Sequence, residues 1–322
     1  MSIVLPPLLC LVLVAVALKL LLDSGLAARI AIDLPNERSL HAAPIPRIGG
    51  IVLVGVALAA AALVAPVLHP LLLIAAALAL ISAWDDRHGL PVLLRFAVHV
   101  AAAVGAIILL QIDAPVWILV VVASLLTWAM NLYNFMDGAD GLAGGMALFG
   151  FGALGVAAMD AAPDIAVACF CVAAAAGGFL WHNFHPARVF LGDAGSIPLG
   201  FLAGSLGLSG WSSGLWPAWF PLLVFSPFIV DASLTLAARL LRGQKPWQAH
   251  REHAYQRMVS GGLGHRRTAL LWYAVIAACA ASALAGLRLS ATPQWALVAG
   301  WVLIYGILAA VTTRRFPLPR KA

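Results

Sequence analysis

Residues 115–141 read PVWILVVVASLLTWAMNLYNFMDGADG, an apolar run that ends in a cluster of amides and acids. The apolar part is long enough for a transmembrane helix and shows no period-two alternation, which argues against a β-strand. Asn131, Asn134, Asp137 and Asp140 then recur at every third position, and glycines follow both acids. The stretch therefore predicts a membrane helix that breaks into a tight polar loop at its end.

The composition places the whole chain in a membrane. Of its 322 residues, 63% are hydrophobic and only 10% are charged, whereas soluble domains carry about 25% charged residues. Only helices or closed barrels satisfy the backbone in lipid, so we expect an all-α polytopic membrane protein that forms one domain over residues 1–322. We predict about eleven transmembrane helices, over residues 3–22, 48–66, 70–84, 92–110, 115–132, 141–159, 164–181, 195–209, 217–238, 268–286 and 294–313.

The Lys and Arg residues indicate the orientation. All of them except Lys19 and Arg288 fall in the connections after odd-numbered predicted helices, next to such a connection (Arg95), or in the C-terminal tail. Because positively charged loops stay in the cytoplasm, these connections are predicted to be cytoplasmic and the N-terminus periplasmic. The first apolar segment has no basic residue ahead of it, so we interpret it as a retained helix and not as a signal peptide. Topology and anionic lipid head groups explain the net charge of +6, and no nucleic acid is expected as a partner.

Carboxylates gather at the predicted cytoplasmic ends of these helices. Asp85 and Asp86 end one helix, Asp137 and Asp140 lie between two, and Asp193 precedes another. A carboxylate at bilayer depth costs about 2.5–3.5 kcal/mol, so such residues usually mark a functional site. All five are predicted on one face of the membrane, as expected for a site that joins a divalent cation to a phosphate-rich substrate.

Each of these acids also has a purely structural interpretation. Asp140 and Asp193 stand where a side chain can cap the next helix, and Asp85 and Asp86 can form a solvated helix end with Arg87. For Asp193 the metal interpretation is favoured, because flanking glycines admit a ligand and a helix N-terminus suits phosphate. Acids are disfavoured at a helix C-terminus, which weakens the structural explanation for the adjacent pair. These two carboxylates repel each other, so one can act as a base or both can share a cation.

The connection over residues 239–267 is rich in Arg and His. His250 and His253 lie one helical turn apart, with Arg257 four residues further, and together they form a face suited to a diphosphate. A basic loop is more often only a topological determinant, and zinc binding by the two histidines lacks a third soft ligand nearby. The four cysteines fall inside apolar segments and are interpreted as packing residues. No P-loop or Rossmann glycine pattern occurs.

In this combination the chain resembles the polyprenyl-phosphate N-acetylhexosamine-1-phosphate transferase family, which includes bacterial enzymes that initiate O-antigen. The motifs that carry the resemblance follow in order: DLPNERSLHAAPIPRIGG over 33–50, the Asp85-Asp86 pair, NLYNFMDGADGLAGG over 131–145, Asn183 with FLGDAGS over 190–196, and PFIVDASLTLAARLLRG over 227–243 before the His/Arg loop. The resemblance implies transfer of an N-acetylated amino-sugar-1-phosphate from a UDP-sugar to undecaprenyl phosphate. UMP leaves and a lipid-linked sugar diphosphate forms, the first membrane step of O-antigen or related cell-envelope polysaccharide synthesis.

The resemblance also implies roles for individual residues and a location in the cell inner membrane. Asp193 and Asp137 would hold magnesium, with manganese as an alternative. Asp85 and Asp86 would position or deprotonate the acceptor phosphate, while His250 and His253 would serve the reacting diphosphate together with Arg257. A homodimer is suggested by the relatives. The remaining positions would bind the nucleotide sugar: Asn131, Asn134, Asp137, Asp140, Asn183, Arg38 and His41.

One departure and one alternative function remain. Many relatives carry a His-x-His-His cluster in the last cytoplasmic loop, where this chain has His253-Ala-Tyr255-Gln256. The variant resembles the subgroup that starts lipopolysaccharide O-antigen and argues against the muramoyl-pentapeptide enzyme. The alternative is an ion-coupled secondary transporter that uses its membrane-embedded carboxylates. That function predicts acids near the bilayer midplane and paired interrupted helices, and the sequence shows neither pattern.

Overall fold

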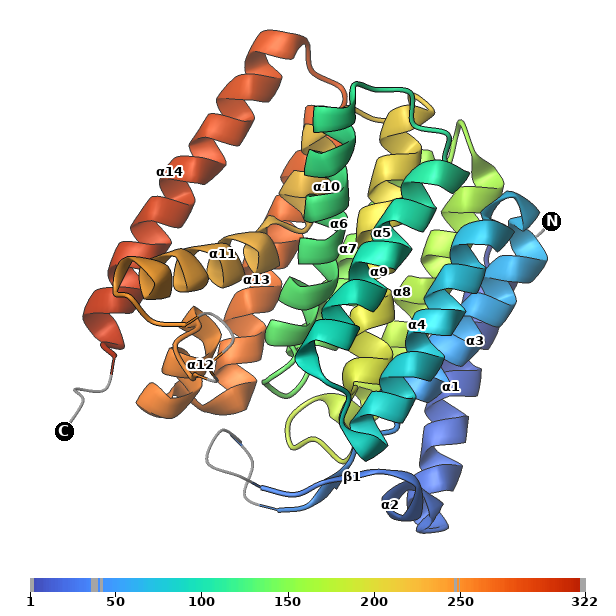
Figure 1. Ribbon diagram of the computed structural model, residues 1–322, viewed down its shortest axis with the longest axis vertical. Coiled ribbons are helices and arrows are strands. Elements are labelled where there is room, and N and C mark those ends of the chain that lie inside the picture. The colour runs from blue at the N-terminus through green and yellow to red at the C-terminus, as the bar shows by residue number, and fades with distance from the viewer. Residues whose placement is uncertain (1–2, 36–39, 41–42, 246–247, 249, 319–322) are drawn as a thin grey trace.

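The computed structural model of the protein describes residues 3–35, 40, 43–245, 248 and 250–318, and this part of the chain is almost entirely helical, as predicted (Figure 1). A short antiparallel pair, β1 (Ile32–Asp33) and β2 (Ile45–Pro46), provides the strands of the described residues. Single turns of 3₁₀ helix (Pro66–Leu68) and π-helix (Val259–Leu263) lead into α4 and α13. The helices are α1 (Leu5–Asp23), α2 (Leu26–Ile30), α3 (Gly49–Val64), α4 (His69–His88), α5 (Val92–Leu109), α6 (Val116–Phe135), α7 (Leu142–Ala158), α8 (Pro163–Asn183), α9 (Asp193–Ser212), α10 (Trp219–Val224), α11 (Ser226–Leu241), α12 (Ala254–Met258), α13 (Gly264–Gly286) and α14 (Ala291–Arg315).

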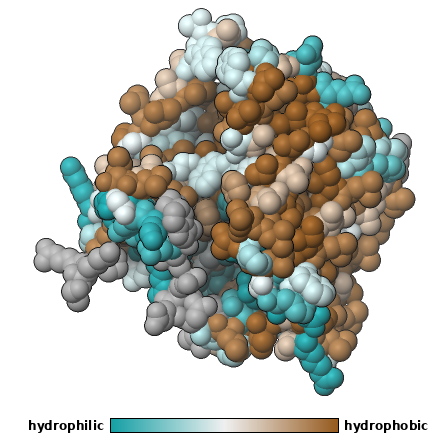
Figure 2. All heavy atoms as spheres, in the orientation of Figure 1, coloured by the Kyte–Doolittle hydropathy of each residue, from teal (hydrophilic) through white to brown (hydrophobic). Residues whose placement is uncertain are grey.

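The outer surface is that of a membrane protein. Seven of the described helical segments are long and apolar enough to cross a bilayer, and α3 and α7 are shorter apolar helices. Each predicted transmembrane segment overlaps one of the helices, although eleven crossings and their orientation stay predictions. Leu63 and Leu93 are each 79% exposed, which in water would be unfavourable and in lipid is expected. Apolar residues cover most of the face shown in Figure 2.

Two helices form the centre of the bundle. α8 packs against α1, α3 and α7, while α9 packs against α3, α4 and α6. α8 is rich in Ala and Gly, α9 is rich in Gly and Ser, and these small side chains allow the neighbouring backbones to approach closely, as is typical of helix packing in lipid. The first residue of α9 is therefore held by several helices at once.

The prediction of one continuous helix over residues 217–238 is wrong. Residues 217–238 were expected to form one helix, but the structure divides them at Phe225 into α10 and α11. Pro227 lies in the first turn of α11, where its missing N–H and fixed φ favour a new helix start over continuation. In Figure 1, α11 runs across the direction of the bundle toward α14.

A network of backbone hydrogen bonds joins the polar loop after α2 to the start of α9. The N–H of Phe190 donates to the carbonyl of Pro46 over 2.8 Å, and the N–H groups of Gly49 and Gly50 donate to Phe190 and Leu191 over 2.9 Å each. The two segments thus lie side by side in a strand-like arrangement. As a result, the residues that follow each of them, Arg47 and Asp193, come together.

The helices α3 and α9 meet without any side chain between them. A Cβ atom added to Gly50 would lie 2.4 Å from the Cα and the N of Gly195. Real Cβ atoms do not approach a backbone this closely. The first turns of the two helices therefore require glycine at their contact.

Candidate active site

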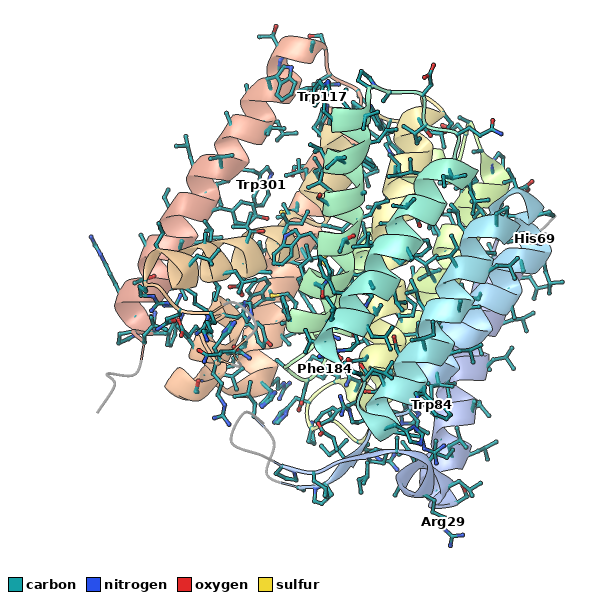
Figure 3. All side chains as sticks on the ribbon, viewed as in Figure 1. Arg29, His69, Trp84, Trp117, Phe184 and Trp301 are labelled. Atoms are coloured by element: carbon teal, nitrogen blue, oxygen red, sulfur yellow. The ribbon has the colours of Figure 1, made fainter. Side chains whose placement is uncertain are left out.

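A polar cavity of about 270 Å³ opens at the end of the bundle where α6 and α8 end and α9 begins. Phe184, labelled in Figure 3, marks this end of the molecule. Five of the residues predicted from sequence line the cavity: Asn134, Asp137, Asp140, Asn183 and Asp193. The other lining residues are Asp33, Leu40, Arg47, Gly138, Ala139, Phe190, Gly192, Gln256 and His265.

Arg47 holds several carboxylates together at one side of the cavity. Its Nη2 lies 3.2 Å from Asp86 Oδ1 and 3.9 Å from Asp193 Oδ1, and its Nη1 lies 3.8 Å from Asp33 Oδ1. The backbone N–H of Ala194 also donates to Asp86 Oδ2 over 3.3 Å. The end of α4 is thereby tied to the positive end of α9, which explains how an acid is tolerated at a helix C-terminus.

Arg95, from the first turn of α5, reaches the same group of acids. Its Nη1 lies 3.3 Å from Asp85 Oδ2 and 3.9 Å from Asp193 Oδ2. The other oxygen of Asp85 accepts the N–H of Leu90 over 2.5 Å. Asp193 therefore stands between two arginines, while Asp85 and Asp86 each have a separate arginine partner.

Asp137 and Asn134 approach Asp193 from the end of α6. The side chain of Asn134 hydrogen-bonds to Asp193, and the N–H of Gly192 faces the Asp137 carboxylate. Burial, reinforced by the negative charge of Asp193, raises the pKa of the Asp137 carboxyl well above its ordinary value. The positive charge of Arg47 therefore does not fully balance the negative charges of Asp137 and its neighbouring carboxylates.

This donor set fits a hard divalent cation such as magnesium. The groups that face one another are carboxylates and an amide, which are the oxygen ligands that magnesium prefers. Among the described residues, no three of these carboxylates bring oxygens within 4.8 Å of one another. Magnesium commonly uses one or two carboxylates and completes its shell with water and substrate phosphates, so Asp193 and Asp137 suffice as protein ligands.

Asp140 and Asn183 form the opposite wall of the cavity. Asn183 Oδ1 accepts the N–H of Gly141 over 2.9 Å, and its Nδ2 donates to the carbonyl of Val189 over 2.8 Å. The Asp140 carboxylate accepts the N–H of Ala187 and faces His185, and it does not cap α7, whose N-cap residue is Gly141. Asp193 is likewise the first residue of α9 and not its cap. Neither acid has the purely structural role that its position in sequence allowed.

The structure does not bring every predicted residue to the cavity. Asn131 lies one turn earlier on α6, where its Nδ2 donates to the carbonyl of Thr127 over 2.7 Å and lies 3.2 Å from His99 Nδ1. It therefore faces α5 and not the polar cavity. Arg38 and His41 lie outside the described residues.

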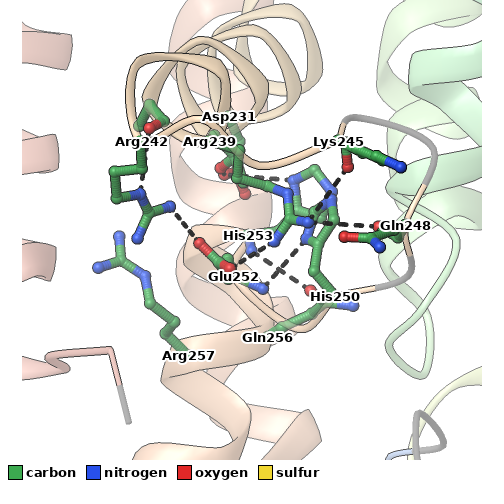
Figure 4. Close-up of polar contacts among 12 residues, drawn as sticks. Asp231, Arg239, Arg242, Lys245, Gln248, His250, Glu252, His253, Gln256 and Arg257 are labelled. Atoms are coloured by element: carbon green, nitrogen blue, oxygen red, sulfur yellow. Dashed lines mark hydrogen bonds and ion pairs between the residues drawn. The ribbon is translucent and has the colours of Figure 1, made fainter. Parts of the chain in front are cut away.

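His250, His253 and Arg257 belong to a second cluster around the start of α12 (Figure 4). Asp231 of α11 accepts the N–H of Ala254 over 2.8 Å and lies 3.8 Å from His253 Nδ1. Burial, with a contribution from His253, lowers the pKa of His250 to about 4. The ring of His250 is therefore uncharged at neutral pH and adds no positive charge to this cluster.

A much larger apolar cavity, of about 960 Å³, lies beyond α12. The short helix α12 forms part of both cavity walls: Gln256 lines the polar cavity, while Ala254, Arg257 and Met258 line the apolar one. Residues spaced by three and four positions share one face of a helix, so the two cavities lie on opposite faces of α12. The rest of the apolar cavity is lined by residues of α11, α13 and α14.

The basic partners of the acids were not predicted from the sequence. Arg47 and Arg95 were used only as indicators of topology, and Gln256 and His265 were not singled out. The position of Arg47 inside the DLPNERSLHAAPIPRIGG motif was the available signal. His185 and His265 gave no local signal, because they meet Asp140 only through the tertiary fold.

The chain is similar to known proteins over most of its length. Residues 68–210 match the sequence profile of "Glycosyl transferase family 4". The decaprenyl-phosphate N-acetylglucosaminephosphotransferase of Mycolicibacterium smegmatis is 30% identical over 90% of this chain and 82% of its own length. The undecaprenyl-phosphate alpha-N-acetylglucosaminyl 1-phosphate transferase of Yersinia pestis is 29% identical over 90% of this chain and 85% of its own length. A probable undecaprenyl-phosphate N-acetylglucosaminyl 1-phosphate transferase of Bacillus subtilis is 27% identical over 76% of this chain and 74% of its own length.

Proposed function

Because the chain belongs to the polyprenyl-phosphate N-acetylhexosamine-1-phosphate transferases of glycosyl transferase family 4, we propose that it transfers an N-acetylated amino-sugar-1-phosphate from a UDP-sugar to undecaprenyl phosphate in the inner membrane. The observation that carries the proposal is the position of Asp193 between Arg47 and Arg95 on the wall of the polar cavity. The product would serve O-antigen or a related envelope polysaccharide.

The reaction replaces one phosphoanhydride bond by another. An oxygen of the acceptor phosphate attacks the β-phosphorus of the UDP-sugar, which carries the sugar. The bond from this phosphorus to the bridging oxygen breaks, and UMP leaves with the electron pair. Such a transfer depends mainly on positioning and on charge stabilisation, which agrees with a site built from acids and arginines around a polar cavity of about 270 Å³.

Each part of the site has a proposed task. Asp193 and Asp137 hold magnesium or manganese, which when bound supplies positive charge to the diphosphate oxygens. Asp85 and Asp86, fixed by Arg95 and Arg47, position the acceptor phosphate. Asn134, Asp140 and Asn183 hold the nucleotide sugar from the other walls.

The apolar cavity is the proposed place of the polyprenyl chain. It lies across α12 from the polar cavity and is lined in part by Arg257, so a polyprenyl chain in it would pass the cluster of His250, His253 and Arg257 on its way to the polar cavity. These residues would then serve the diphosphate from the lipid side. This arrangement gives the His/Arg cluster a task although it does not line the polar cavity.

A donor screen tests the proposed function. Membranes that contain the protein are supplied with undecaprenyl phosphate, magnesium and a panel of labelled UDP-N-acetylamino sugars, including UDP-N-acetylglucosamine and deoxy variants. We expect UMP release and a labelled lipid with at least one donor. Absence of UMP with every donor would contradict the proposal.

The transporter alternative is not favoured. The acids lie at helix ends, and the relatives are named as sugar-phosphate transferases. Uptake of a solute into sealed vesicles without any lipid product would reverse this preference.

Arg47 gives a second test of the site. Replacement of Arg47 by glutamine leaves Asp86 and Asp193 without their shared cation, so we expect UMP release to fall at least about tenfold. Arg29→Gln is the matched control, because Arg29 is exposed on α2, just before the same polar loop, and points away from the body in Figure 3. Equal rates in the two variants would exclude a role for Arg47.

A further inference from the structure

Three side chains from separate elements meet beside the polar cavity. Asp140 precedes α7, His185 follows α8, and His265 lies in the first turn of α13. The ligand atoms of the three residues all lie within 4.8 Å of one another. Asp140 Oδ2 is 2.6 Å from His185 Nδ1, Asp140 Oδ1 is 3.3 Å from His265 Nδ1, and the two imidazole rings stack with a centroid distance of 5.4 Å.

The hydrogen bonds around His265 define which of its nitrogens carries the proton. Its Nε2 lies 3.2 Å from the carbonyl oxygen of Leu40, which requires a proton on Nε2. The backbone N–H of Asp140 donates to Nδ1 over 3.1 Å, which requires an unprotonated Nδ1. Asp140 Oδ1 lies 3.3 Å from the same Nδ1. The single lone pair of Nδ1 accepts the Asp140 N–H, so a cation that binds Nδ1 would replace this hydrogen bond and would at the same time attract the nearby carboxylate oxygen.

The surroundings match those of protein metal ligands. A histidine that binds a metal usually donates its other ring N–H to a backbone carbonyl or a carboxylate, as His265 does to Leu40. A ligating carboxylate is usually hydrogen-bonded as well, and Asp140 accepts the N–H of Ala187 over 3.2 Å. The side chain of Asp140 is only 8% exposed. Its ion pairs among the described residues are with His185 and His265.

We propose that Asp140, His185 and His265 form a binding site for a divalent transition-metal ion such as zinc. Two imidazole nitrogens and one carboxylate are a zinc-type ligand set, whereas magnesium prefers oxygen ligands. The site is separate from the carboxylates around Asp193, which forms ion pairs with Arg47 and Arg95. Water would complete the coordination on the side of the exposed His185.

The site has a consequence for transfer, and this consequence rests on the proposed function. Asp140 and His265 line the polar cavity, so a bound cation withholds both from a nucleotide sugar. Zinc is therefore an inhibitor that competes with the donor substrate. The binding site itself does not depend on the identity of the reaction.

Cobalt is the probe for the site, because tetrahedral Co²⁺ with nitrogen ligands absorbs visible light. The purified full-length chain is titrated with Co²⁺ in excess magnesium, which occupies the oxygen sites. We expect one equivalent to bind with tetrahedral absorption, and at least about tenfold weaker binding in His185→Gln and in His265→Gln. His69→Gln is the control and should bind as the parent does, since His69 lies at the opposite end of the molecule from Phe184 in Figure 3. An unchanged spectrum in the His185 and His265 variants, or no absorption in the parent, would overturn the site.

Zinc inhibition is measured separately through UMP release. Zinc should raise the apparent KM for the UDP-sugar, and His185→Gln should require at least about tenfold more zinc for the same inhibition. Cobalt binding without zinc inhibition would overturn the inhibitory role. If no donor releases UMP, the proposed function fails while the cobalt spectrum still reports on the site.

Discussion

The Asp193→Asn substitution is expected to reduce UMP release at least about 100-fold. Asparagine keeps the size of the side chain but removes the charge that pairs with Arg47 and Arg95 and that would hold magnesium. The backbone of α9 should be unaffected, because its N-cap residue is Gly192 and the N–H of Ala194 in its first turn donates to Asp86, so Asp193 does not cap this helix. The rate is measured with the donor found in the screen, at magnesium concentrations that saturate the parent chain.

Asp113→Asn is the matched control for this prediction. Asp113 is exposed in the connection between α5 and α6, and its predicted place is the periplasmic face. We expect the parent rate for this variant and the same elution profile in detergent for both variants. Nearly normal transfer by Asp193→Asn at saturating magnesium would remove Asp193 from the metal site.

The Gly50→Ala substitution is expected to have the largest effect on stability. The added methyl group would lie 2.4 Å from backbone atoms of Gly195, and a backbone in a helix cannot rotate away as a side chain can. Overpacking usually costs about 1–3 kcal/mol, and a contact with backbone lies at the upper end of this range. We expect a lower melting temperature in detergent, and loss of transfer in the folded fraction because Asp193 would be displaced.

Gly55→Ala provides the control on the same helix. A Cβ at Gly55 would have no neighbour within 4 Å, so alanine should be neutral or slightly stabilising there. Equal melting temperatures for the two alanine variants would show that α3 and α9 can separate without cost. That result would also remove the argument that this contact positions Asp193.

Much of the fold could be predicted because lipid imposes a simple constraint on sequence. Apolar runs of membrane length located the helices, including the end of α6 at Phe135 close to the predicted boundary at Leu132. The division of residues 217–238 was missed because both α10 and α11 are apolar. Hydropathy indicates that a segment is buried in lipid but not the direction of its helix axis. Pro221 and Pro227 were the signal that the helix is interrupted.

The acids of the candidate site could be predicted from the sequence, whereas its basic residues could not. Asp137 and Asp193 were identified because carboxylates are rare in apolar sequence. Arg47 and Arg95 are just as close to the site, but a membrane protein has many basic residues on one face for topological reasons. The motif over 33–50 was a signal for Arg47, whereas the contact of Arg95 with Asp193 depends on how α5 and α9 lie in the fold and has no local pattern.

The five residues of α12 have a practical meaning for inhibitor design. If the nucleotide sugar and the polyprenyl chain lie in the two cavities as proposed, a molecule with a nucleotide-like head and an alkyl tail needs a linker that bends around α12, since Gln256 lines the polar cavity and Arg257 the apolar one. Straight, rigid spacers would reach only one cavity. Medicinal chemistry on such bisubstrate compounds should therefore vary linker curvature before linker length.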